Sequence, residues 1–134
     1  MESVTFGEAQ AVLDAAFAKA TEIGTPMSVA IVDIGRSLLA FGRQDEAKLG
    51  SIDVAIGKAY TSRSLDMNTE DVGPLTQPGA PLFGLQATNP LVIGFGGGRP
   101  LSRGGVVVGA VGVSGGSVEQ DQEVADAAVE AFTG

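Results

Sequence analysis

The chain has 134 residues, of which 16 are acidic and 8 are basic, so its net charge is −8. This length predicts a single domain over residues 1–134, and the negative charge argues against nucleic acid or an anionic membrane as a partner. Cysteine and histidine are both absent, which excludes disulfides, thiol nucleophiles, histidine-based triads and zinc fingers. We expect a soluble cytoplasmic protein, because the chain starts without a secretory signal pattern and its apolar runs are too short to cross a bilayer.

The first half of the chain predicts a helix, a hairpin and a second helix. A capping box at Thr5 to Glu8 begins the first helix, and Gly24 ends it. Two β-rich runs, 27–33 and 37–41, are separated by a short connection that favours an antiparallel hairpin. Ser51 is predicted to cap the second helix. The side chains expected to face inward from that helix are Ile52, Ala55, Ile56, Ala59 and the methylenes of Arg63.

The second half is irregular at first and then rich in glycine. Prolines and glycines interrupt residues 67–89, which predicts a loop with a short helical turn. The glycine block from Gly94 to Asp121 predicts a strand, a glycine turn, a short strand and a strand over 106–113. A last helix follows a second capping box at Ser117, with an expected core stripe of Val118, Ala125, Ala128, Val129 and Phe132. The order α-β-β-α-irregular-β-β-β-α indicates the α+β class, with an antiparallel sheet of about five strands flanked by helices.

Two interpretations of the glycine block stay open. The spacing fails both the dinucleotide fingerprint and the P-loop, because the third glycine of the first and the Gly-Lys-Ser/Thr of the second are missing. The segment from Gly112 to Ser117 does lead from a strand to a helix N-terminus, where exposed amides bind anions. Glu119 and Asp121 already place negative charge there, so tight packing of strand and helix is the alternative to an anion site.

Four side chains in the first half are candidates for chemistry. Arg43 and Asp45 follow the second strand, where side chains often line a cleft, although a solvated loop explains them equally well. Lys58 lies next to the inward face of its helix, as either a surface lysine or a partly buried one reaching Asp33 or Asp45. Burial would lower its pKa unless a carboxylate compensates. Tyr60, the single tyrosine, is predicted to be a packing residue with a hydrogen-bonded tip.

Several segments together resemble the GlcG/HbpS family, small domains also found at the C-terminus of PduO-type corrinoid proteins. The resemblance covers nearly the whole chain. The segments are Val32-Asp33, Arg43-x-Asp45, Lys58-Ala59, Gly97-Gly98-Arg99-Pro100, and Gly109 to Gly116 followed by Glu119-Gln120-Asp121. Two turns depart from the family pattern: the usual Asp-x-Gly-Gly ends in Arg36 here, and the usual Arg-Met-Asp-Gly is Arg43-Gln44-Asp45-Glu46.

The resemblance implies an antiparallel sheet flanked by helices, assembly into homo-oligomers and a cleft for a small molecule. Tetrapyrrole binding, of haem or a corrinoid, is the activity best known in the family, although no cofactor is required by the prediction. Haem iron is usually held by His, Cys, Met or Tyr, and the first two are absent here. Tyr60, Met27 and Met67 are the formal candidates, so any haem would bind without histidine.

The first functional hypothesis is a small-molecule-binding module. Its cleft would lie between the 94–100 loop and the Arg43–Asp45 region, with Lys58 and Asp45 ordering the wall. Glycine amides and Arg43 or Arg99 would hold an anionic group, and no metal site is predicted. The ligand-binding residues predicted are Asp33, Gly97, Gly98, Arg99, Ser114 and Gly115.

The alternative is a cofactor-independent isomerase or lyase acting on a small carbonyl or carboxylate compound. Asp45 or Asp33 would be the general base, while Arg43 and Lys58 would stabilise developing negative charge. A carboxylate shielded by apolar neighbours, which raises its pKa, would favour the enzyme, and fully solvated carboxylates would favour the binding module. A third, purely structural hypothesis is that the glycine block packs subunits of an oligomer together.

Overall fold

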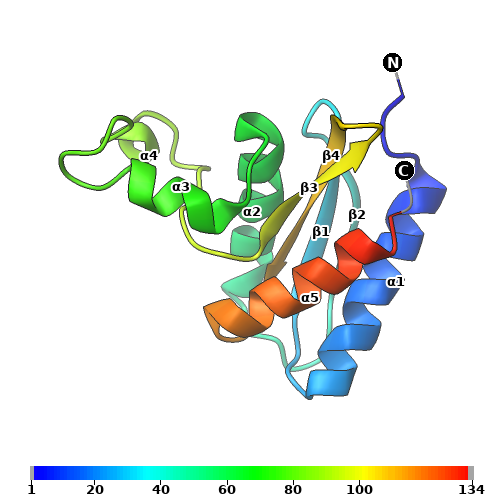
Figure 1. Cartoon of the computed structure of the whole chain (residues 1–134). Coiled ribbons are helices and arrows are strands. Elements are labelled where there is room, and N and C mark those ends of the chain that lie inside the picture. The colour runs from blue at the N-terminus through cyan, green and yellow to red at the C-terminus, as the bar shows by residue number, and fades with distance from the viewer. Residues whose placement is uncertain (1, 133–134) are drawn as a thin grey trace.

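The protein folds into a four-stranded antiparallel sheet with helices on both faces. The computed structural model describes residues 2–132, and its strands lie in the order β2-β1-β4-β3. The strands are β1 (Ser28–Asp33), β2 (Leu38–Arg43), β3 (Gly98–Arg103) and β4 (Val106–Ser114). Helices α1 (Phe6–Ile23) and α5 (Val118–Glu130) cover one face, and α2 (Ser51–Leu65) packs against β1 and β4 on the other (Figure 1). The predicted α+β class is therefore confirmed.

The sheet has four strands because the segment before Gly94 is not one of them. Ile93 lies along α2 instead: its amide donates to the Thr61 hydroxyl at 2.9 Å. Gly57 makes room for the Ile93 side chain, since a Cβ there would stand 2.8 Å from it. The hydrogen bond and the apolar contact of Ile93 are therefore made with α2 and not with a neighbouring strand.

Both predicted capping boxes are present. Thr5 accepts from the Glu8 amide at the start of α1, and Ser117 accepts from the Gln120 amide at the start of α5, with each partner side chain bonding back. Gly24 ends α1 with a left-handed φ of 76°. These ends were predictable because every group in them lies within a few residues in the chain.

The core is divided by the sheet. Larger aliphatic side chains fill the side of α1 and α5, whereas the α2 side is built from Ala30, Val32, Ala55, Ala59 and Ala110. Such small residues let α2 lie close to the sheet. A Cβ at Gly112 would overlap the carbonyl oxygen of Ala55, so β4 and α2 touch backbone to backbone at this point.

The predicted faces of α2 and α5 need correction. Gly50, not Ser51, is the N-cap of α2; Ser51 is the first helical residue and shares a 2.7 Å hydrogen bond with Ser28. The buried residues of α2 are Ser51, Ala55, Gly57, Lys58, Ala59, Thr61 and Ser62, while Ile52, Ile56 and Arg63 are half-buried. In α5 the buried stripe is Asp121, Val124, Ala125 and Ala128, and Val118 is exposed.

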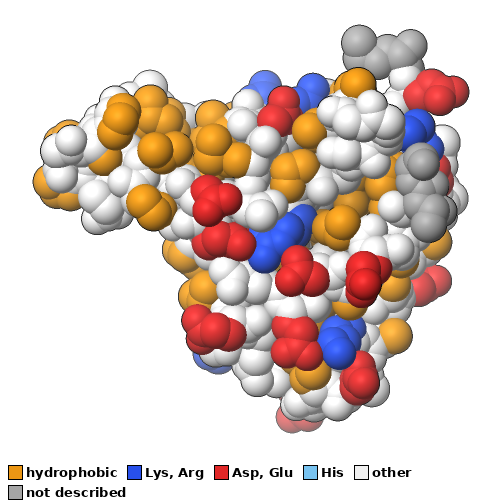
Figure 2. All heavy atoms as spheres, viewed as in Figure 1, with side chains coloured by type: hydrophobic (Ala, Val, Ile, Leu, Met, Phe, Trp, Pro, Cys, Tyr) orange, Lys and Arg blue, Asp and Glu red, His pale blue; other side chains and the backbone are white. Residues whose placement is uncertain are grey.

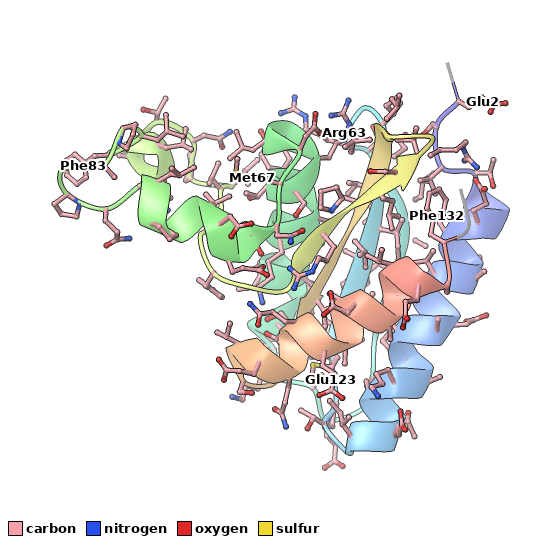
Figure 3. The ribbon with its side chains drawn as sticks, viewed as in Figure 1. Glu2, Arg63, Met67, Phe83, Glu123 and Phe132 are labelled. Carbon is pink, nitrogen blue, oxygen red and sulfur yellow. The ribbon has the colours of Figure 1, made fainter. Side chains whose placement is uncertain are left out.

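The segment predicted as an irregular loop forms an arm that projects from the sheet and its helices (Figure 1). It contains the short helices α3 (Thr69–Leu75) and α4 (Leu85–Thr88). Apolar side chains gather on the arm (Figure 2), and Phe83 lies at its outer end (Figure 3). Within residues 2–132, no helix has the length and apolar composition needed to cross a membrane.

Candidate functional site

A fully buried lysine lies beneath the glycine block. The Lys58 ammonium group donates to the Asp121 carboxylate at 2.9 Å and to the Val113 carbonyl at 2.8 Å. The ring of Phe95 covers it, with the ring centroid 5.0 Å from Nζ. Lys58 has no exposed surface and Asp121 is 3 % exposed. From the sequence, Lys58 was predicted to be either a surface lysine or a partly buried one that reaches Asp33 or Asp45. In the structure its partner is Asp121, a residue of α5 on the other side of the sheet.

Burial is the largest influence on the pKa of both Lys58 and Asp121. Loss of hydration lowers the pKa of Lys58 from its ordinary value, and the nearby carboxylates of Asp121 and Glu70 oppose that shift. Loss of hydration likewise raises the pKa of Asp121, opposed by Lys58 and by the Gly116 amide. Each charge is therefore kept in the core by the other.

The glycines around the pair serve close approach. A Cβ at Gly97 would lie 2.7 Å from the Lys58 ammonium nitrogen, and Gly97 has a left-handed φ of 129°. The Gly98 amide, predicted to hold an anionic ligand, donates to the Thr69 hydroxyl at 2.8 Å. At the start of α5, the Gly116 amide donates to Asp121 at 2.9 Å. The anion at this helix N-terminus is thus the protein's own carboxylate, and the packing interpretation of the block holds here.

An open groove runs along the solvent side of α2, formed by two hollows that share Val54. We call it the α2 groove. The first hollow, of about 360 Å³, is lined by Lys48, Gly50, Ser51, Val54, Phe95, Ser114 and Gly115. The second, of about 280 Å³, is lined by Asp53, Val54, Ile56, Gly57, Tyr60, Pro90, Leu91 and Ile93. Its walls are mainly apolar, and a lysine stands at one end.

Arg43 and Asp45 belong to a different hollow. They line a groove of about 610 Å³ between the end of α1 and the end of β2, whose other walls include Phe17, Thr21 and Pro26. Both side chains are exposed. The single predicted cleft is therefore divided: Ser114 and Gly115 border the α2 groove, while Arg43 and Asp45 border this second one.

Arg99 and Asp33 have partners within the fold. The Arg99 guanidinium donates to Glu70 at 2.5 Å and to Asp126 at 2.9 Å, linking the base of the arm to α5. The Asp33 carboxylate lies at the other end of β1, where it accepts from the amides of Gly35 and Ser37 at 2.8 and 2.9 Å. Asp33 thus orders the β1–β2 turn, at the opposite end of β1 from Ser28 and the first hollow.

Three residues of this region were missed from sequence: Asp121, Phe95 and Lys48. Asp121 had a signal, because it lies three, four and seven residues before the buried residues of α5 and so shares their face. Its place near the N-terminus of α5, where the helix dipole favours negative charge, also explains an acidic residue there without any buried partner. Phe95 had no such signal, because its position over the Lys58 ammonium group follows from the course of the glycine block and not from any periodicity.

The residues able to hold a metal or haem iron are few. Residues 2–132 contain no cluster of three acidic side chains that could bind a metal ion. Met27 is fully buried, whereas Tyr60 borders the α2 groove. The Tyr60 hydroxyl accepts hydrogen bonds from Asn89 at 3.0 Å and Arg36 at 3.1 Å.

Comparison with known proteins identifies a family. The family model described as haem degrading protein HbpS-like matches residues 4–130. An uncharacterised 15.0 kDa protein of Citrobacter freundii, from the dhaT-dhaS intergenic region, is 42% identical over 98% of this chain and 93% of its own length. The corrinoid adenosyltransferase PduO of the same organism is 37% identical over 97% of this chain, which spans only 39% of PduO.

Solved structures of similar proteins have the same fold as this chain. The Klebsiella pneumoniae protein ORFY superposes with a TM-score of 0.96 at 42% identity, over 99% of this chain and 92% of ORFY. A PduOC haem complex superposes with a TM-score of 0.93 at 35% identity, over 96% of this chain and 94% of PduOC. HbpS gives a TM-score of 0.91 at 27% identity, over 100% and 93%.

Proposed function

Because the chain belongs to the HbpS-like family, we propose that it is a small-molecule-binding domain whose ligand is a tetrapyrrole, haem or a corrinoid, bound without histidine. The observation that carries the proposal is the α2 groove. Two adjoining, mainly apolar hollows with a lysine at one end suit a flat, largely apolar molecule with an anionic edge. The haem complex of the related PduOC domain supports the ligand class.

We expect the anionic edge of the ligand to lie at the Lys48 end of the groove. Lys58 and Arg99 are already neutralised by carboxylates of the fold, so neither is available to a ligand. Lys48 is an exposed cation beside the start of α2, where the helix dipole is positive. Ser114, 8 % exposed, adds a hydroxyl to the same wall. Apolar ring atoms would then lie against Phe95 and the hollow beyond Val54.

The isomerase or lyase alternative finds less support. Asp45 is exposed and Asp33 is occupied by two backbone amides, so neither candidate base is shielded by apolar neighbours. Asp121 is shielded, yet its charge is committed to Lys58. By the criterion of a shielded, available carboxylate, the arrangement favours binding over acid–base catalysis.

Titration with haemin and with cobalamin tests the proposal, with absorbance and melting temperature as readouts. We expect a spectral shift and a raised melting temperature for at least one of them. Phe95→Ala should weaken binding about tenfold through lost aromatic contact. Phe6→Ala, which removes a more exposed phenylalanine on α1 (60 % against 47 %), should not. If the unaltered protein shows no response, the tetrapyrrole proposal is refuted. If both variants weaken binding equally, the ligand does not bind in the α2 groove.

We also propose that the chain self-associates through its arm. Leu82 and Phe83 are exposed there by 39 and 65 %. Apolar side chains gathered on an exposed surface, as on the arm (Figure 2), commonly mark an interface between proteins. A second copy of the chain is the occupant that the family resemblance favours.

A further inference from the structure

The surroundings of Tyr60 suggest more than packing. Tyr60 lies on α2 at the border of the second hollow of the α2 groove, beside Pro90, Leu91 and Ile93. It is half-buried, with its ring against the fold and its hydroxyl at the surface. It is also the only tyrosine of the chain. Its phenol group therefore belongs to the border of the groove.

Two donors converge on that oxygen. Asn89 Nδ2 donates to it at 3.0 Å, and the orientation of the amide is fixed because Asn89 Oδ1 accepts from the Leu91 amide at 3.1 Å. Arg36 NH1 donates at 3.1 Å, and its guanidinium carbon stands 4.8 Å from the centre of the Tyr60 ring. Two N–H donors, one of them cationic, therefore fix the position of the Tyr60 oxygen.

Arg36 holds this position at a conformational cost. It is in the β1–β2 turn with a left-handed φ of 71°, a conformation that residues other than glycine rarely adopt. Its guanidinium also donates to Ser64 at 3.3 Å, so the side chain is anchored along α2. The turn thus delivers a cation to the tyrosine even though glycine would be the less strained residue there.

The other iron-binding side chains fit less well. The sequence has no cysteine or histidine, and Met27 is fully buried in the core. Met67 lies at the junction of α2 and α3 (Figure 3) and is half-buried, outside the residues lining the α2 groove. Tyrosine oxygen is an established axial ligand of haem iron. Tyr60 is the candidate ligand that borders the groove.

We propose that Tyr60 is the residue that would hold the iron of ferric haem in the α2 groove, with Arg36 and Asn89 as the donors that orient its oxygen. This inference rests on the proposed function, since it requires haem to bind in that groove. On binding, the Tyr60 phenol would lose its proton to solvent, and its oxygen would take the place of the water or hydroxide that ferric haem carries in solution. No electron is transferred, and the iron stays ferric.

Resonance Raman spectroscopy of the haemin-loaded protein tests the inference, because any phenolate mode enhanced by the iron must come from Tyr60. We expect these modes in the unaltered protein and in Met67→Leu, the control for the other candidate ligand. They should vanish in Tyr60→Phe, which keeps the ring. Arg36→Gln should weaken haemin binding about tenfold, as loss of a ligand's hydrogen-bond partner commonly does.

The outcomes separate the two proposals. If haemin binds the unaltered protein without phenolate modes, or if the spectrum of Tyr60→Phe is unchanged, the tyrosine ligand is wrong and tetrapyrrole binding stands. If haemin does not bind the unaltered protein at all, the proposal of haem binding fails, and the tyrosine ligand fails with it.

Discussion

Lys58 has no contact with solvent, so its charge depends on the counterion Asp121. Its ammonium group is held between a carboxylate, a carbonyl and an aromatic ring, from α5, β4 and the glycine block. Removing a charge of this pair strands the other in a medium of low dielectric constant. The pair therefore fixes the wall of the α2 groove rather than contacting a ligand.

Lys58→Met and Asp121→Asn should each lower the free energy of unfolding by about 3–5 kcal/mol, because each leaves one buried charge unpaired. The double variant should cost clearly less than the sum of the two, since it leaves no unpaired charge. Urea denaturation of the four proteins measures this coupling. Simple additivity would show that the two charges do not depend on each other.

A second ion pair predicts how stability changes with pH. The Arg103 guanidinium donates to both Glu8 oxygens, at 2.9 and 3.0 Å, and this lowers the pKa of Glu8 from 4.5 to about 2. A carboxyl group with a lowered pKa contributes stability above its unfolded value and loses it as pH falls towards the folded value. The contribution of Glu8 should therefore disappear between about pH 4.5 and 2.

Arg103→Gln should flatten the dependence of unfolding free energy on pH in that window. Arg63→Gln is the matched control, because it removes a surface arginine paired with Asp66 and leaves Glu8 untouched. Denaturation at a series of pH values compares the three proteins. An Arg103→Gln protein that loses stability on acidification as steeply as the unaltered one contradicts the assignment.

The contact of α2 with β4 depends on glycine at one point. Gly112→Ala would overlap the Ala55 carbonyl and place a methyl group 2.5 Å from the Ala59 nitrogen. Backbone cannot rotate out of the way as a side chain can, so we expect a loss of about 3 kcal/mol in unfolding free energy. Gly7→Ala on α1 has open space around its Cβ and should be neutral or slightly stabilising. Equal thermal denaturation of both variants would contradict this packing.

The elements that could be predicted well from the sequence are those that depend on residues close together in the chain. The capping boxes at Thr5 and Ser117 and the β1–β2 hairpin depend on neighbouring residues, and all three are confirmed. The face of α2 was misjudged because hydrophobicity favours Ile52 and Ile56 over Lys58. The partner of Lys58 lies 63 residues away along the chain, so burial of the lysine follows from tertiary packing and not from periodicity.

The same distinction applies to the candidate site. Ser114 and Gly115 were predicted as ligand-binding residues and border the α2 groove, and that role stays a prediction. Arg43 and Asp45 were predicted in the same cleft, yet they line another hollow. Which segments meet across α2 depends on the course of residues 90–95, which form no strand. No pattern in the sequence indicated that course.

Across the whole molecule, the projecting arm predicts self-association. Light scattering after size-exclusion chromatography should give a mass that is a multiple of 13.5 kDa. Replacing Leu82 and Phe83 by serine should shift the protein towards the monomer, because apolar surface on the arm is removed. Phe6→Ser is the control for loss of an exposed aromatic side chain elsewhere. A monomeric unaltered protein, or an arm variant of unchanged mass, contradicts self-association through the arm.

A crystal structure of the protein loaded with haemin would show whether the α2 groove holds a tetrapyrrole without histidine. We expect haemin density along α2, with the carboxylate edge near Lys48 and Ser114 and the ring plane against Phe95 and Leu91. Haemin in the groove of Arg43 and Asp45, or on a surface remote from α2, would contradict it.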